Sequence, residues 1–171
     1  MDDSKMLWCL AHSLDIVARS HVELGTIAPA EIFARKALEL SETGLLRFGL
    51  GPGADADWVT LRVPSSLTTL ARVYCGLNKL AAARLYVRRA VEYSREIFHC
   101  SPLPQTANKF ACALHWYEEL LAQLRVGEDN DLSELCSLED WKALSAHLRI
   151  SKKWPIYSYV AEKVQVLNGL Q

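Results

Sequence analysis

Apolar side chains recur along the chain every three or four residues, and strict alternation is confined to a short piece near "DWVTLRV". That spacing is typical of α-helices with one apolar face, so we predict an all-α fold. Glycine, proline and asparagine interrupt the pattern and mark the helix ends. About seven helices are expected, over residues 4–24, 29–42, 64–77, 80–99, 105–126, from 133 with a further break near 138, and 156–168.

The longest interruption is "TGLLRFGLGPGADADWVTLR", which holds four of the eight glycines in the chain together with Pro52. It is too flexible for a helix and too long for an ordinary connection, so we predict a loop insertion over residues 43–63. Its "GLGPGADAD" segment lacks the Lys-Ser/Thr ending of a phosphate-binding loop. The glycines therefore indicate flexibility rather than a nucleotide site.

Small residues return at matched positions when the chain is compared with itself. The central copy has Leu67, Leu70, Ala71 and Tyr74 on one helix, Asn78 at a turn, and Ala83, Val87 and Ala90 on the next. The first copy has Leu14, Val17, Ala18 and His21, then Gly25, then Ala30, Ala34 and Ala37. A third copy begins with Phe110, Ala113, Leu114 and Tyr117. Short side chains at fixed places allow two helices to approach closely.

These offsets resemble the tetratricopeptide repeat (TPR). The stretch "ARLYVRRAVEYSREIFHCSPLPQTANKFACALHWYEELLAQL" is similar to the extended repeats of the kinesin light chain type, with a long second helix, a proline-containing link and a "TA" start. Ala71 and its counterpart Leu114 lie 43 residues apart, against 34 in the plain repeat. Two features depart from the family pattern: His21 stands where an aromatic residue is usual, and the insertion stretches the first spacing to 53 residues.

The resemblance, which covers roughly residues 10–126, implies a right-handed superhelical array of antiparallel helix pairs in a single domain over 1–171. The expected parts are repeat 1 (about 10–42), the insertion, repeat 2 (about 64–99), partial repeat 3 (about 104–149) and a C-terminal capping helix (155–168). An irregular helical bundle is the alternative fold.

The last helix has an apolar stripe that includes Tyr157. We expect it to cover the exposed end of the array; the alternative is that it docks onto a neighbouring subunit.

Composition narrows the function classes. With 19 basic and 20 acidic residues the net charge is −1, so no overall field would attract nucleic acid. No apolar run reaches the roughly 20 residues of a transmembrane helix. Five cysteines, an odd number, indicate reduced thiols in an intracellular compartment, either the cytosol or an organelle. The N-terminus lacks the features of a secretory signal, although an internal or already cleaved signal stays open.

The resemblance implies that the first helix of each repeat lines a concave groove that binds other proteins. The corresponding positions are His12, Asp15 and Arg19, then Ser65, Thr68 and Arg72, then Asn108, Cys112 and His115. Arg19, Arg72 and His115 occupy equivalent places, and guanidinium groups there would bind a carboxylate-bearing segment. Alternatively, these side chains are solvated or paired with acids in the adjoining repeat. Further candidate anchors for a partner are Trp58, Trp154 and Tyr157, although the tryptophans would also serve as lids over the array.

Two Cys-x-x-His pairs, Cys9 with His12 and Cys112 with His115, have the spacing of metal ligands on one helix face. They lie on separate copies, so we expect no zinc site. No nucleophile sits on a sharp turn, so we expect no catalytic residue either, and no cofactor. The sequence favours a non-catalytic protein–protein interaction module that acts as a scaffold or accessory subunit of a larger assembly. The alternative is a free adaptor that grips an acidic or extended peptide in its groove.

Overall fold

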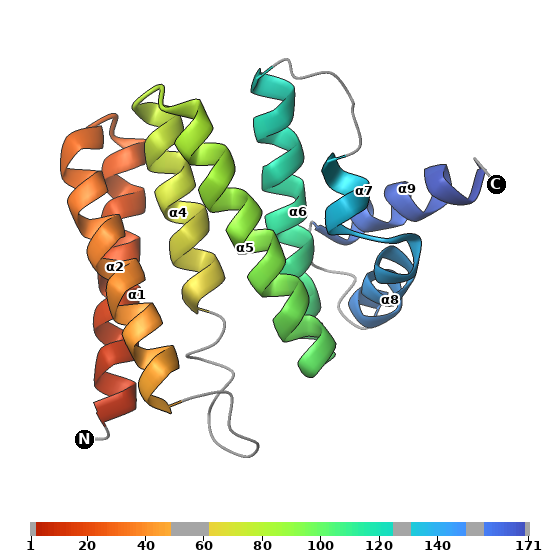
Figure 1. The fold of residues 1–171 in the computed structure, drawn as a ribbon, viewed down its shortest axis with the longest axis horizontal. Helices are drawn as coiled ribbons and strands as arrows, with labels where there is room; N and C mark the ends of the chain where they lie inside the picture. The colour runs from red at the N-terminus through yellow and green to blue at the C-terminus, as the bar shows by residue number, and fades with distance from the viewer. Residues whose placement is uncertain (1–2, 49–61, 125–130, 150–155, 170–171) are drawn as a thin grey trace. The chain divides into compact units, whose positions relative to one another are not determined.

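The computed structural model describes residues 3–48, 62–124, 131–149 and 156–169 (Figure 1). Within these ranges the chain forms helices and short connections and no strand, which confirms the predicted all-α class. The helices are α1 (Asp3–Glu23), α2 (Ile27–Phe48), α4 (Arg62–Gly76), α5 (Leu80–Cys100), α6 (Pro104–Leu124), α7 (Asp131–Leu135), α8 (Leu138–Leu148) and α9 (Ile156–Gly169).

The largest difference from the predicted boundaries is at the end of α2. Residues 43–48, assigned to the insertion, continue the helix, and α4 starts at Arg62 inside the predicted loop. Gly44 is buried, so its missing side chain suits close packing in the helix interior, and tertiary contact outweighs its poor helix propensity. The remainder of the predicted insertion, residues 49–61, lies outside the described residues.

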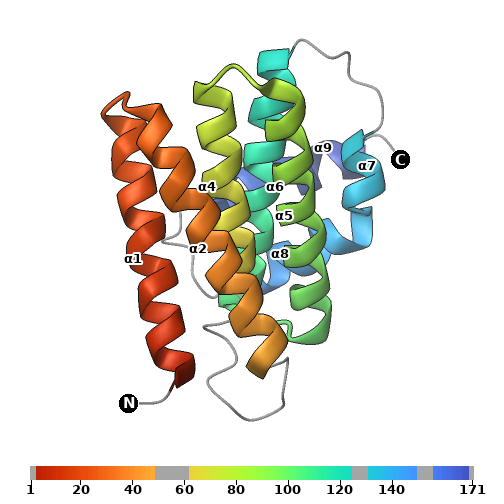
Figure 2. The same cartoon turned by 60° about the vertical axis from the view of Figure 1, so that its left-hand side comes forward.

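The chain divides into two compact units, Met1–Tyr93 and Ser94–Gln171, with the boundary inside α5. In the first unit α2 packs on both α1 and α4, and α1 also contacts α4 (Figure 2). In the second unit α8 and α9 contact each other, and both contact α6. The single domain expected over 1–171 stays a prediction.

Two turns in the first unit are built in the same way. Gly25 and Asn78 adopt left-handed backbone angles, with φ of 73° and 56°. Each of these residues donates its backbone N–H to the carbonyl three residues earlier, at 3.1 Å for Gly25 and 2.9 Å for Asn78. The next residue in each turn, Thr26 or Lys79, donates to the carbonyl five residues earlier, at 2.9 and 2.8 Å. This pattern ends a helix and reverses the chain, and glycine or asparagine adopts it at lowest cost.

The alanines of the two copies are buried. Ala18, Ala30, Ala34, Ala37, Ala71, Ala83 and Ala90 are each at most 4% exposed. Leu67, Leu70 and Tyr74 are also buried, so larger side chains fill the space beside the alanines.

A pair of stacked rings accompanies each turn. His21 stacks on Phe33 with ring centres 5.5 Å apart and an interplanar angle of 11°. Tyr74 stacks on Tyr86 at 5.3 Å and 16°. Each member of the second pair lies 53 residues after its counterpart in the first. His21 therefore fills the aromatic position of its copy with an imidazole ring.

The core of the second unit combines α6 with the C-terminal helices. Its fully buried side chains include Phe110, Leu114, Tyr117, Leu144, Leu148 and Val160. The expected break near residue 138 is confirmed: α7 ends at Leu135, and Ser137 caps the start of α8. On α9, Val160 is fully buried whereas Tyr157, Val164 and Leu167 are half-buried.

Candidate partner-binding surface

The predicted groove residues belong to three helices in two units. In the first unit α1 carries His12, Asp15 and Arg19, and α4 carries Ser65, Thr68 and Arg72. In the second unit α6 carries Asn108, Cys112 and His115. Since α1 and α4 contact each other, the first six residues come from neighbouring helices. A continuous row of Arg19, Arg72 and His115 stays a prediction.

Asp15 is the most buried of these residues, with 2% of its surface exposed. Its Oδ2 lies 3.5 Å from a terminal nitrogen of Arg19, one helical turn away, and Arg19 Nε donates weakly to the Asp15 carbonyl at 3.4 Å. Asp15 Oδ1 is buried and accepts no hydrogen bond from any residue in the described part of the chain. Arg19 is therefore paired with an acid of its own helix, not with one in the adjoining repeat as the alternative had it.

Arg62, which the sequence reasoning missed, sits beside this site. It donates a hydrogen bond to Nδ1 of His12 at 2.6 Å, and its guanidinium carbon lies 4.8 Å from the centre of the Trp8 ring. Trp8 and His12 stack at 5.3 Å. Burial lowers the pKa of Arg62, although the nearby Asp15 acts in the opposite direction. Because arginine keeps its charge in proteins, the site holds a half-buried cation against two rings.

The groove positions predicted on α4 are only partly exposed. Ser65, Thr68 and Arg72 are half-buried, and the Thr68 hydroxyl donates to the carbonyl of Pro64 at 2.9 Å. A neighbouring polar contact ties α4 to α2: the Tyr74 hydroxyl donates to Oε1 of Glu31 at 3.1 Å and accepts a hydrogen bond from Arg35.

The α6 positions are engaged within the second unit. His115 Nε2 lies 3.5 Å from Oε1 of Glu119, and its ring centre is 4.8 Å from that of Tyr159 on α9. The Cys112 thiol lies 3.9 Å from Oδ1 of Asn108, a weak contact, and burial raises the pKa of Cys112. His115 therefore packs against α9 while part of its side chain stays exposed, and Asn108 and Cys112 contact each other along α6.

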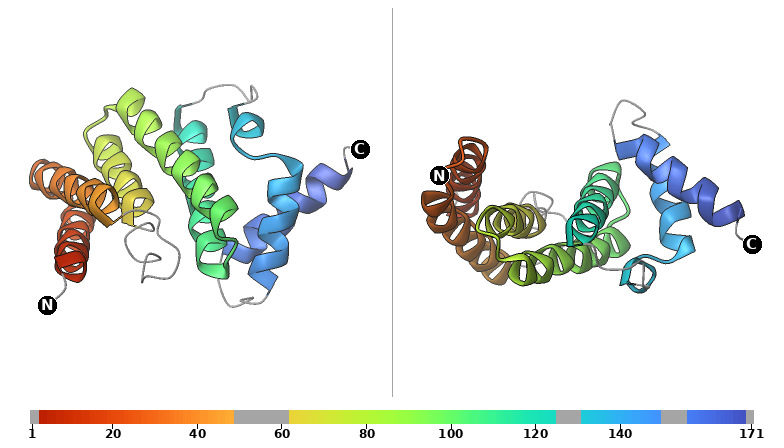
Figure 3. Two further views of the ribbon diagram at one scale, coloured as in Figure 1. Left: turned by 60° about the horizontal axis from the view of Figure 1, so that its bottom comes forward. Right: turned by 90° about the horizontal axis from the view of Figure 1, so that it is seen from above.

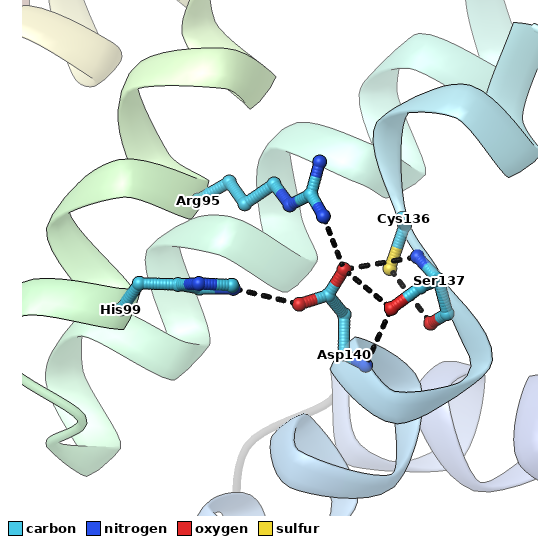
Figure 4. A network of polar contacts seen from close by, with 5 residues as sticks. All are labelled: Arg95, His99, Cys136, Ser137 and Asp140. Atoms are coloured by element: carbon cyan, nitrogen blue, oxygen red, sulfur yellow. Dashed lines mark hydrogen bonds and ion pairs between the residues drawn. The ribbon is translucent and has the colours of Figure 1, made fainter.

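A second polar site, not expected from the sequence, is centred on Asp140 in α8 (Figure 4). The carboxylate is 5% exposed and accepts hydrogen bonds from the Ser137 backbone and hydroxyl, both at 2.9 Å. Arg95 lies 3.1 Å from Oδ2, and His99 Nε2 lies 2.7 Å from Oδ1. Ser137 also accepts from the Asp140 N–H at 3.1 Å, which completes a capping box at the start of α8.

The electrostatics of this cluster favour the ionised carboxylate. Burial alone would raise the pKa of Asp140, but hydrogen bonds from Ser137 and His99 and the charge of Arg95 outweigh it and hold the pKa below its usual value. Burial raises the pKa of the neighbouring Cys136 thiol, and the negative charge of Asp140 adds to that effect. The cluster therefore fastens the first turn of α8 to the end of α5 and keeps the thiol protonated.

Of the proposed anchors, Trp58 and Trp154 lie outside the described residues, and Tyr157 is half-buried on α9. The five cysteines are free, and no group of three metal-binding side chains occurs in the described ranges. Cys9 is exposed, whereas Cys112 faces Asn108.

None of the described helices combines the length and apolar character needed to cross a membrane.

Comparison with known proteins found no match, whether to a protein family, to a curated protein or to a solved structure.

Proposed function

We propose that this chain is a non-catalytic TPR-like module, closest to the kinesin light chain type, that acts as a scaffold or accessory subunit of a larger assembly. The observation that carries the proposal is the structural equivalence of residues 53 positions apart in the first unit. Gly25 and Asn78 form the same turn, and His21 and Tyr74 make the same kind of ring stack. Different residues thus build the same feature twice, as repetition of one structural unit requires.

A third copy is supported by burial in the second unit. Phe110, Leu114 and Tyr117 are fully buried and lie 43 residues after Leu67, Ala71 and Tyr74. In the proposed superhelical array each repeat contacts only its neighbours, so long faces of the helices stay available to other proteins. The proposed activity is therefore binding through an extended surface rather than chemistry in a cavity.

The polar clusters support a non-catalytic role. Both carboxylate oxygens of Asp140 accept hydrogen bonds from residues that position α8, and the adjacent Cys136 thiol is buried and disfavoured as a thiolate. A catalytic acid, base or nucleophile needs a free site for a reacting group. We therefore assign this cluster to the attachment of α8.

A free adaptor is the second candidate, and Asp15 favours an extended rather than an acidic ligand. Arg19 is compensated by Asp15, which weakens its attraction for a second carboxylate. Oδ1 of Asp15 is buried, so a peptide would meet the more exposed guanidinium groups of this face. In this version Arg19 and Arg72 on neighbouring helices would donate hydrogen bonds to backbone carbonyls of an extended segment.

Purification from the native source at about 1 M salt distinguishes the two candidates, since screening at that concentration weakens contacts between exposed charges. An accessory subunit should stay in a larger complex, and replacement of both Arg19 and Arg72 by alanine should leave that complex intact. An adaptor should elute alone and, at low salt, lose its partner when both arginines are replaced. Recovery of the chain alone under every condition would reject both.

A further inference from the structure

Helix α1 has a buried side and, separate from it, an exposed apolar stripe. One side packs within the first unit, where Ala11, Asp15 and Ala18 are at most 2% exposed. The helices that contact it there, α2 and α4, run along that side (Figure 3). Away from that side, α1 and the residue that follows it, Leu24, carry an outer stripe of large apolar residues that are between 38% and 76% exposed: Met6, Leu10, Val17 and Leu24. At 100° per residue the four lie within about 40° of one another around the helix.

The outer stripe has the pattern of a helix-pairing surface. Ser13 and Ser20 complete its alternation of three- and four-residue steps, and no charged residue falls on it between Met6 and Leu24. Apolar residues repeating in this way form the seam between paired helices. A contiguous exposed apolar surface of this kind is typical of a site of protein–protein contact.

The charges beside the stripe indicate which helix fits. Lys5 and Glu23 are both exposed and lie 18 residues apart, which is five turns at 3.6 residues per turn, so they flank the same side. In an antiparallel pair of two α1 helices, Lys5 of each copy lies close to Glu23 of the other. In a parallel pair, Lys5 of one copy and Glu23 of the other would lie on opposite sides of the seam and at different positions along the helix axis.

The same antiparallel register also matches side-chain sizes. When Met6 faces Leu24 of the other copy, Leu10 faces Ser20 and Val17 faces Ser13. A large side chain thus meets a small one along the middle of the seam, which allows close approach of the two helices. Lys5 and Glu23 are then offset by about 3 Å along the axis, within reach of flexible side chains.

We propose that the chain self-associates through an antiparallel, twofold pairing of two α1 helices along the outer stripe. A twofold interface uses the same surface on both copies, so it closes at a dimer. The surface lies on the opposite side of α1 from Asp15, and the proposal does not depend on the repeat function proposed above.

The first test is sedimentation of the full chain from about 1 to 100 µM, a range that brackets the micromolar affinity of a small interface. The mean mass should rise toward that of a dimer. Leu10→Glu should weaken dimerisation at least tenfold, because it places a charge in the seam. Leu24→Glu, at a side chain that is 76% exposed, should do the same without threatening the fold. Ile32→Glu, at a 69% exposed position on α2, is the matched control and should leave dimerisation unchanged.

The second test addresses orientation. Lys5→Glu and Glu23→Lys should each weaken the dimer, and the double exchange should restore it. Ser20→Cys, with Cys100→Ser to remove another exposed thiol, should give a covalent dimer through Cys9 under mild oxidation. Without Ser20→Cys no such dimer should form, because the two Cys9 residues would lie about 18 Å apart along the seam. A monomer throughout the concentration range overturns the proposal, and so does a dimer linked through Cys9 alone.

Discussion

Replacement of Asp140 by asparagine tests the reasoning about the α8 cluster most directly. The substitution keeps the shape of the side chain and removes its charge. An asparagine oxygen still accepts the hydrogen bond from the Ser137 N–H, so the helix cap is partly retained. That oxygen also faces Arg95, which loses its ion pair, and the amide nitrogen takes the place of Oδ1 and must face His99, another hydrogen-bond donor.

The expected cost is about 2 kcal/mol of unfolding free energy. Hydrogen bonds to a charged group contribute about 1.5–3 kcal/mol when they are buried. Arg95 and His99 are 37% and 52% exposed, so solvent screening reduces each contribution to about 0.5–1 kcal/mol. Partial loss of the cap adds a further fraction of the roughly 1 kcal/mol that such caps contribute.

Urea denaturation at pH 7, followed by tryptophan fluorescence, measures this cost, because Trp141 is buried next to Asp140. Glu139→Gln is the matched control: it removes the same charge from the same first turn at an exposed position. It should change stability by no more than about 0.5 kcal/mol. Equal effects of the two substitutions would show that helix-end charge, and not the buried cluster, stabilises this region.

The cost should depend on pH in a defined direction. The pKa of Asp140 is lowered in the folded chain, so the ionised carboxylate stabilises the fold above the unfolded pKa of about 3.9. That stabilisation is lost as the pH falls through the folded pKa. The difference between wild type and Asp140→Asn should therefore be largest near neutral pH and shrink below about pH 4. A difference that grows on acidification would contradict the assignment of the charges.

Three further substitutions test the packing of the first unit. Gly25→Ala should cost about 1 kcal/mol in thermal denaturation, because φ is 73° while nothing within 4 Å would obstruct a Cβ atom. Ala83→Leu should cost about 1–3 kcal/mol by overpacking a fully buried position, whereas Ala81→Leu at an exposed position of the same helix should be nearly neutral. Tyr74→Phe should cost about 1 kcal/mol through loss of its hydroxyl hydrogen bonds, measured by urea denaturation, with the aromatic core unchanged.

The sequence predicted helix type and most breaks because these depend on local chemistry. Gly25 and Asn78 mark turns through their tolerance of positive φ, which is a property of the residue itself. The break before α8 was predicted near residue 138, and the structure gives its local cause, a capping box formed by Ser137 and Asp140. Gly44 misled the prediction of where α2 ends, because its burial in the helix depends on packing that has no local signal.

The candidate sites were less predictable because they join residues far apart in the chain. Arg62 reaches His12 across 50 positions, and Asp140 reaches His99 across 41. Arg62 also fell inside a predicted loop, where no helix face could be assigned to it. The i, i+4 placement of Trp8 and His12 on α1 was the available signal, since it puts two rings on one face without specifying their partner.

Asp15 shows why residue type alone gives a poor prediction of the ligand. The pattern of basic residues suggested an anion-binding face, yet the carboxylate of Asp15 lies 3.5 Å from Arg19 and is almost completely buried. An acidic ligand that displaced Asp15 from Arg19 would leave a buried charge without its ion pair, at a cost of several kcal/mol. Asp15 is only 2% exposed, so a ligand on this face would meet Arg19 and leave the ion pair in place. If this face of α1 binds a peptide, the carbonyl oxygens of an extended segment, which accept from the guanidinium without competing for its charge, therefore fit it better than acidic side chains.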